Sequence, residues 1–264
     1  MNSSNGEDNF LRRTIRRVDS FFNDDTTYYA ASLSFFTIFS ILPIIALLIA
    51  IISSFSEFKN YLDIFINYIF NLINPTHSSD IVDALKNYVS NSNKLGFIGI
   101  IYMLFVFIMF IKDYEYIVNK IHKAKRKSIQ FSFIFYSIFM AILPLIFAFS
   151  NIIMSFYENT IFKEILSYTF AWIIFFALFK LTVNKHIDNK AALISSFITL
   201  VTLSVTKNLF IYYVIYNKTY TTIYGSLSTL FFTFFWIYIS WIIFLYGVKI
   251  CHKLNIKNKE KNNR

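Results

Sequence analysis

Ala30–Ile52 reads AASLSFFTIFSILPIIALLIAII, and this stretch decides the fold. It contains no charged residue, and its only proline is Pro43. At a rise of ~1.5 Å per residue, a helix of this length can cross the ~30 Å hydrocarbon core of a bilayer. We therefore predict a transmembrane helix over about residues 29–52. Pro43 removes one backbone hydrogen bond, so we expect the helix to bend there.

The composition indicates that lipid forms part of the solvent of this chain. Hydrophobic residues make up 56% of the 264 residues and charged residues 15%, whereas soluble proteins have roughly 45–50% and 25%. The 33 Phe and 18 Tyr residues could not all be hidden inside a soluble domain of this size. The single cysteine, Cys251, excludes a disulfide within the chain and a zinc site built from several thiolates.

Five further apolar segments follow the first, so we predict an all-α polytopic membrane protein. It would be one membrane domain with six transmembrane helices and would begin with a basic amphipathic segment over residues 1–28. A basic tail over residues 251–264 would follow the last helix. The predicted spans are about residues 29–52, 95–111, 131–154, 165–183, 191–216 and 223–250.

The long connection between the first two spans, residues 53–94, carries two amphipathic patterns. Apolar residues recur at helical spacing from Phe58 to Ile73 and again from Ile81 to Val89, with Asn74-Pro75 between them. We predict an amphipathic helical hairpin on the outer side of the membrane. An interfacial hairpin and a re-entrant hairpin both fit the pattern.

Basic residues are concentrated on one side of the predicted membrane. Six spans place both termini on the same side, and 19 of the 25 Lys and Arg residues lie there. Because positively charged segments stay on the cytoplasmic side, both termini are predicted to be cytoplasmic. The net charge of +10 follows from this bias, so we expect membrane lipids, anionic ones included, as partners and no nucleic acid. The other basic residues are Lys59, Lys86, Lys94, Lys163 and Lys218 on the outer side and Lys207 inside the fifth span.

Three motifs resemble those of a known family. Residues 31–43, ASLSFFTIFSILP, resemble the A-L-x-Y/F-Y/F-x-x-x-S-x-x-P signature of the YihY/BrkB family. Asn119 and Ile121 stand where that family has L-N-x-I-W, and residues 224–247 resemble its last helix. The residues that carry the motifs are Ser34, Phe36, Asn119, Gly225, Trp236, Ser240 and Gly247.

The resemblance covers about residues 12–250 and implies a six-helix inner-membrane protein with both ends in the cytoplasm. Members of the family were once labelled ribonuclease BN, and the family is linked to envelope integrity and to lipid or solute export. Two positions depart from its pattern. The family's Gly-Ala-Glu is Gly247-Val248-Lys249 here, and the tryptophan of the loop motif is replaced near His122.

We interpret most of the motif residues as structural. Gly225 and Gly247 are typical of close helix packing, and Asn119 of a tie between a cytoplasmic loop and a helix end. Trp236 fits a lipid-facing aromatic side chain better than the wall of a pocket. Ser40 and Pro43 fit either a kink that lines a cavity or a tolerated bend.

Lys207 is the strongest candidate for a binding residue, and Asn208 follows it. A charge near the bilayer centre costs ~2.5–3.5 kcal/mol on insertion scales, so such residues tend to face a polar interior. We expect Lys207 to attract an anionic group such as a lipid phosphate. The alternative is that its long side chain snorkels to the outer headgroups.

Catalysis finds little support in the sequence. The four histidines, His77, His122, His186 and His252, stand on different connecting segments, and we expect no metal cluster. The chain also lacks a phosphate-binding glycine loop. We therefore expect no enzyme activity and no cofactor.

Two functions remain open at this point. One is a transporter or flippase for a lipid or another anionic amphiphile, and the other is an envelope scaffold that does not transport. The old ribonuclease label is disfavoured because no cluster of metal ligands is present in the sequence.

Overall fold

A computed structural model describes residues 25–53, 87, 96–126, 128–157, 159–216 and 227–262. Within these ranges the chain is helical apart from short connections, which confirms the all-α prediction for this part of the protein. The helices are α2 (Asp25–Ser53), α5 (Gly96–Ile121), α6 (Ile129–Ser155), α7 (Thr160–Leu181), α8 (Asn189–Tyr216) and α10 (Leu227–Asn262).

Three helices of the described part are long and apolar enough to cross a bilayer. They are α7, α8 and the stretch Leu230–Glu260 of α10. The prediction of six spans with both ends in the cytoplasm therefore remains a prediction.

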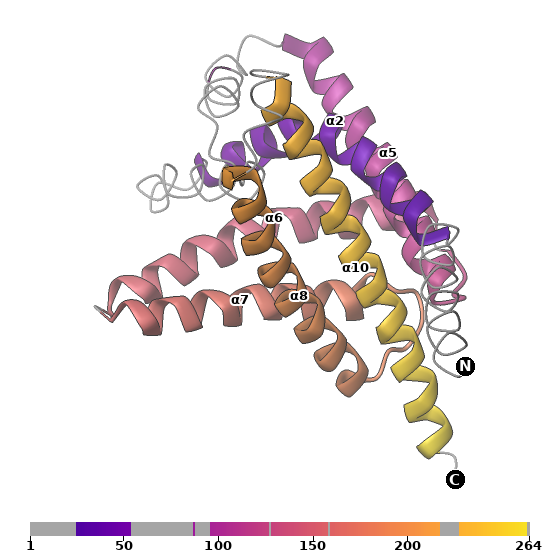
Figure 1. Ribbon diagram of the computed structural model, residues 1–264. Helices are drawn as coiled ribbons and strands as arrows, with labels where there is room; N and C mark the ends of the chain where they lie inside the picture. The colour runs from indigo at the N-terminus through magenta and orange to yellow at the C-terminus, as the bar shows by residue number, and fades with distance from the viewer. Residues whose placement is uncertain are drawn as a thin grey trace, which may run out of the picture.

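Four helices lie side by side, and two run across them. α10 packs against α8 on one side and α2 on the other, and α2 in turn packs against α5. Figure 1 shows α6 and α7 as a hairpin that crosses these four helices and projects away from them. The start of α2 and the end of α10 point toward the same end of the molecule (Figure 1). We call this end, which also carries the loops 122–128 and 182–188, the basic end.

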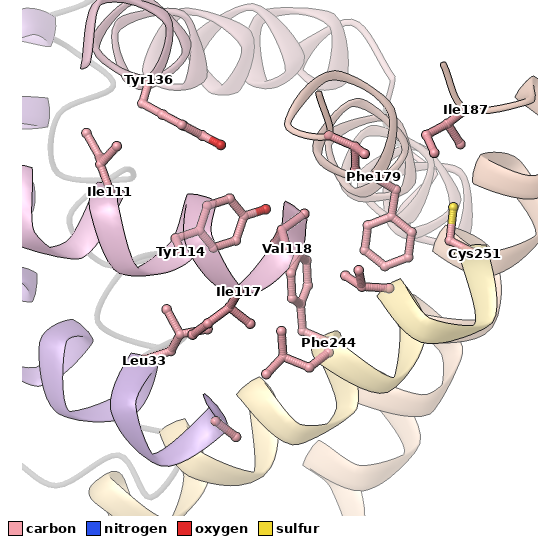
Figure 2. Close-up of a cluster of buried hydrophobic side chains, with 14 of the residues drawn as sticks. Leu33, Ile111, Tyr114, Ile117, Val118, Tyr136, Phe179, Ile187, Phe244 and Cys251 are labelled. Atoms are coloured by element: carbon pink, nitrogen blue, oxygen red, sulfur yellow. The ribbon is translucent and has the colours of Figure 1, made fainter. Parts of the chain in front are cut away.

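The core lies where α5 meets α2, α6, α7 and α10. Figure 2 shows Leu33, Tyr114, Phe179 and Phe244 converging there from four of these helices. Tyr114 and Tyr136 meet edge to face at 5.8 Å, which is a favoured arrangement of aromatic rings. This cluster fixes the ends of α5, α7 and α10 relative to one another.

Two helices are longer than predicted. α5 continues from the expected end at residue 111 to Ile121, and α10 continues from about residue 250 to Asn262. The predicted basic loop over 112–130 is therefore wrong in its first half, and the predicted tail over 251–264 is helical through Asn262. The reason is packing: Tyr114, Ile117 and Val118 recur at helical spacing and are buried, although Lys and Asp residues lie between them.

Two of the three prolines, Pro43 and Pro144, lie inside described helices. α2 continues across Pro43 and α6 across Pro144. The ribbon of α2 changes direction along its length in Figure 1, in agreement with the bend expected for a helix that contains proline.

Several predicted features lie outside the described residues. They are the basic segment over residues 1–24, the hairpin over 54–94 except Asn87, and the motif residue Gly225.

Candidate functional site

The closest helix contact brings α8 against α10 at Gly247. A Cβ atom added at Gly247 would overlap Thr199 Oγ1 and would lie 2.9 Å from Phe179 Cζ. Only glycine fits such a contact without displacing its neighbours.

A groove of about 810 Å³ is lined by the second half of α8 and the first half of α10. Its walls are mainly phenylalanine and aliphatic side chains, with the hydroxyl groups of Thr206, Tyr213 and Ser228 as the polar part. Its size falls within the usual range of ligand pockets. The lining residues are Thr206, Leu209, Phe210, Tyr213, Ser228, Phe231, Phe232, Phe235 and Ile239.

Trp236 packs behind Phe210, one of the residues that line the groove. Its ring stacks on Phe210 with centroids 5.4 Å apart, and its side chain is only 5% exposed. The interpretation of Trp236 as a lipid-facing residue is therefore wrong. The indole packs inward because α8 and α10 contact each other along this face.

Lys207 and Asn208 stand beside the groove and are not among its lining residues. Lys207 directly follows Thr206 on α8 and is half-buried, while Asn208 is exposed. In the described part of the chain Lys207 Nζ has no hydrogen bond or ion pair. The lysine is therefore available to a charged group that approaches this end of α8.

The motif serines are occupied by contacts within the protein. Ser40 is buried, and its Oγ donates to the carbonyl oxygen of Thr37 at 3.3 Å. Thr37 Oγ1 accepts a hydrogen bond from Trp241 Nε1 at 2.8 Å, which ties α2 to α10. The structure does not bring Ser40 to the groove, and the side chain of Pro43 lies outside the described residues.

Other residues of the motifs act in the same local way. Ser34 Oγ donates to the carbonyl oxygen of Ala30 at 2.5 Å, and Ser240 Oγ to that of Trp236 at 2.8 Å. Phe36 is half-buried and meets Phe35 edge to face at 5.7 Å. These contacts lie within single helices.

A second site lies at the basic end, where the loop 182–188 is held between two helices. Asn119, fully buried on α5, accepts a hydrogen bond through Oδ1 from the Asn184 backbone N–H at 2.8 Å. On the other side, Asn255 Oδ1 of α10 accepts from the Asp188 backbone N–H at 2.9 Å. Two further contacts join Asn184 Nδ2 to Glu115 Oε1 and Asn258 Nδ2 to Asp188 Oδ2.

Two histidines meet beside this loop. His122, directly after α5, and His252 on α10 lie edge to face with ring centroids 5.2 Å apart. His122 is 0% exposed, and within the described residues neither of its ring nitrogens has a hydrogen-bond partner. Burial, followed by the charges of His252 and Lys185, lowers the pKa of His122 to about 3.

The expectation that the histidines are scattered is wrong for this pair. It failed because α5 and α10 were predicted to end early, which placed His122 in a loop and His252 in a tail. The charge bias already placed both histidines on the same side of the membrane. The helical periodicity of Ile117, Val118 and Ile121 was the signal that could have brought His122 close to α10.

The chain resembles bacterial membrane proteins of one family. The family described as virulence factor BrkB matches residues 18–264. A UPF0761 membrane protein of Pseudoalteromonas atlantica is 27% identical over 207 residues, which cover 73% of this chain and 67% of the relative. A UPF0761 membrane protein of Actinobacillus pleuropneumoniae is 28% identical, over 74% of this chain and 76% of the relative. Another from Haemophilus influenzae is also 28% identical, over 71% of this chain and 74% of the relative. No solved structure matches the chain.

Proposed function

This chain belongs to the virulence factor BrkB family of membrane proteins, and we propose that it binds an anionic lipid and moves it across the bacterial inner membrane. The groove between α8 and α10 is the observation that carries the proposal. In this proposal the basic end faces the cytoplasm, in accordance with the positive-inside rule.

The chemistry of the groove suits a lipid chain. Phenylalanine and aliphatic walls offer an acyl chain the same apolar surroundings as the bilayer, and a helix pair within the membrane is reached directly from the lipid phase. The few hydroxyl groups, such as that of Thr206, suit the ester region between the chain and the headgroup.

Lys207 supports an anionic headgroup. It follows Thr206 directly, it is half-buried, and the described residues provide no partner for its ammonium group. A phosphate group that comes close strongly stabilises a charged ammonium group in apolar surroundings. The neutral surroundings of Lys207 therefore favour an anionic lipid over a zwitterionic one.

One observation favours a scaffold as the second candidate. The apolar window of α7 has no buried residue, and Ile161 and Ile165 are 69% and 59% exposed. Such a helix is covered by lipid or by another membrane protein. A scaffold would use the α6–α7 hairpin and would tolerate changes in the groove.

Movement of labelled lipids in vesicles tests the proposal. The purified protein is reconstituted with fluorescent phosphatidylglycerol or phosphatidylcholine, and a membrane-impermeant quencher reports how fast each lipid leaves the inner leaflet. We expect faster movement of phosphatidylglycerol than in protein-free vesicles. An equal rate with and without protein would overturn the transport proposal.

Matched variants then locate the path. Thr206→Trp would fill the groove, whereas Val205→Trp places the same bulk one residue away at an exposed position outside the lining. We expect only Thr206→Trp to slow both lipids. Lys207→Gln should slow phosphatidylglycerol alone, and Lys207→Arg should retain the wild-type rate. If Lys207→Gln leaves the phosphatidylglycerol rate unchanged, snorkelling is the better account of this lysine.

A further inference from the structure

We propose that the basic end contains a binding site for a phosphate group, formed by His122, His252, Lys123 and Lys185. The site is distinct from the groove, and its residues come from the end of α5, the loop 182–188 and α10. It goes beyond the proposed function and does not depend on lipid movement.

The first argument is the unsatisfied histidine. A neutral imidazole has one N–H donor and one acceptor nitrogen. Both ring nitrogens of His122 are buried and find no partner in the part of the chain that the structure describes, and each unpaired group of this kind costs about 1–3 kcal/mol. A phosphate oxygen would accept the N–H hydrogen bond that the protein itself does not provide.

The second argument is the sign of the surrounding charges. Burial is the main cause that lowers the pKa of both histidines, and the surrounding positive charges add to it: His252 and Lys185 act on His122, and Lys185 and Lys123 act on His252. The acidic groups nearest to the loop are already engaged: Glu115 accepts from Asn184, and Asp188 accepts from Asn258. Among the described residues neither Lys123 nor Lys185 forms an ion pair with these carboxylates, so both ammonium groups remain available to an anion.

Lys123 provides an independent argument from the backbone. Its φ of 51° lies in the left-handed region, which glycine and asparagine adopt far more readily than lysine. A non-glycine residue in this region costs about 1–2 kcal/mol. Such strain tends to persist where the side chain serves a function.

The turn at Lys123 also limits the repulsion between a phosphate and the carbonyl groups at the C-terminal end of α5. Helix C-terminal carbonyl groups repel anions. Here the carbonyl oxygens of Val118, Asn119 and Lys120 accept hydrogen bonds from the backbone N–H groups of the turn that follows, at 2.9–3.2 Å. These three carbonyl groups are therefore occupied by the protein's own backbone and are less able to repel a phosphate.

In the proposed site, the His252 ring would have to move before a phosphate could reach His122. It is partly exposed and packs over the buried His122. A change of its side-chain rotamer would open a path to His122, and its ring would then lie beside the bound phosphate. The site therefore suits a phosphate carried either by a lipid headgroup or by a soluble molecule.

Titration of the full-length protein in a phosphate-free maltoside detergent tests this site. Binding of inorganic phosphate and of short-chain phosphatidic acid is measured by calorimetry, with chloride as the reference anion. In parallel, NMR of ¹⁵N-labelled histidine follows protonation of His122. We expect binding to raise the pKa of His122, because a nearby anion stabilises the imidazolium form.

The two ligands distinguish the source of the phosphate. Tight binding of inorganic phosphate indicates a soluble ligand, and tighter binding of phosphatidic acid indicates a lipid headgroup. Binding of neither ligand, or equal binding of chloride, would overturn the proposal.

Variants with little effect on folding make the result specific. Lys123→Gly should relieve the strained backbone and raise the melting temperature, yet weaken phosphate binding about tenfold, as the loss of one charged contact predicts. Lys185→Gln should weaken binding similarly. Lys190→Gln, an exposed lysine at the same end, is the matched control and should bind as the wild type does. Unchanged binding by both Lys123→Gly and Lys185→Gln would contradict the site.

Lipid movement provides a separate readout. Loss of phosphate binding in Lys123→Gly with a normal lipid rate would leave the transport proposal intact. Loss of lipid movement in Thr206→Trp with normal phosphate binding would leave this second site intact.

Discussion

The buried side chain of Asn119 bonds to the backbone of a loop 65 residues further along the chain: its Oδ1 accepts from Asn184 N–H at 2.8 Å. The Nδ2 group of the same side chain donates to the carbonyl oxygen of Glu115 at 2.9 Å. One amide thus contacts a carbonyl of the preceding turn of α5 and fixes the start of the loop 182–188. Neither aspartate nor leucine can provide both a donor and an acceptor in this position.

Asn119→Ala should loosen this loop. The substitution leaves the Asn184 N–H without its partner and should lower the free energy of unfolding by about 1–3 kcal/mol. Hydrogen exchange of residues 182–188 should rise relative to α8. Asn151→Ala is the control, because Asn151 also donates to a carbonyl four residues earlier and has no such loop contact. Exchange that rises equally in both variants would contradict the role of Asn119.

Gly247→Ala should separate α8 from α10. The new methyl group would overlap Thr199 Oγ1, and overpacking of this kind typically costs about 1–3 kcal/mol. The melting temperature in detergent measures the loss. The double variant with Thr199→Ala lacks the overlapping hydroxyl group and should recover part of the lost melting temperature. If Gly247→Ala melts as the wild type does, the close contact is absent in the protein.

Acid should destabilise the protein through His122. Its pKa is about 3 when folded and 6.5 in the unfolded chain, so the unfolded state binds the extra proton between these values. Stability from the neutral ring is therefore complete above pH ~6.5 and is lost progressively as the pH falls toward ~3. In phosphate-free buffer, the melting temperature should fall less steeply in His122→Phe than in the wild type. Equal slopes would show that His122 is solvated.

Cysteine labelling should place the basic end in the cytoplasm. In a Cys251→Ser background, Lys125→Cys and Lys257→Cys should react with an impermeant maleimide only after the inner membrane is permeabilised. Phe156→Cys, at the exposed turn between α6 and α7, should react in spheroplasts with an intact inner membrane. If Lys125→Cys and Lys257→Cys are labelled from opposite sides of the membrane, the two positions do not lie at the same end of the molecule. If all three variants are labelled from the side opposite to the one expected, only the predicted orientation is wrong.

The apolar segments predicted most of the described helices because hydrophobic length is a local property of the sequence. α6 spans Ile129–Ser155 where 131–154 was expected, and α8 spans Asn189–Tyr216 where 191–216 was expected. The ends of α5 and α10 were predicted poorly. Their last turns contain many charged residues, and burial of only one face keeps them helical.

The sites depend on contacts that single-sequence patterns do not encode. Lys207 was singled out because one charge in an apolar span is visible from sequence alone. The groove beside it depends on how the side chains of α8 and α10 pack against each other, which a single sequence does not determine. The meeting of His122 with His252, 130 residues later in the chain, likewise depends on where two helices end.

The loop 182–188 is fastened mainly by asparagine side chains. An amide carries no charge and does not titrate in the physiological range. The bonds that Asn119 and Asn255 accept from this loop should therefore be insensitive to ionic strength and to changes in membrane potential. The basic end thus combines two amide contacts that carry no charge with exposed charged side chains such as that of Lys185. Ligands could come and go there without altering the connection between α7 and α8.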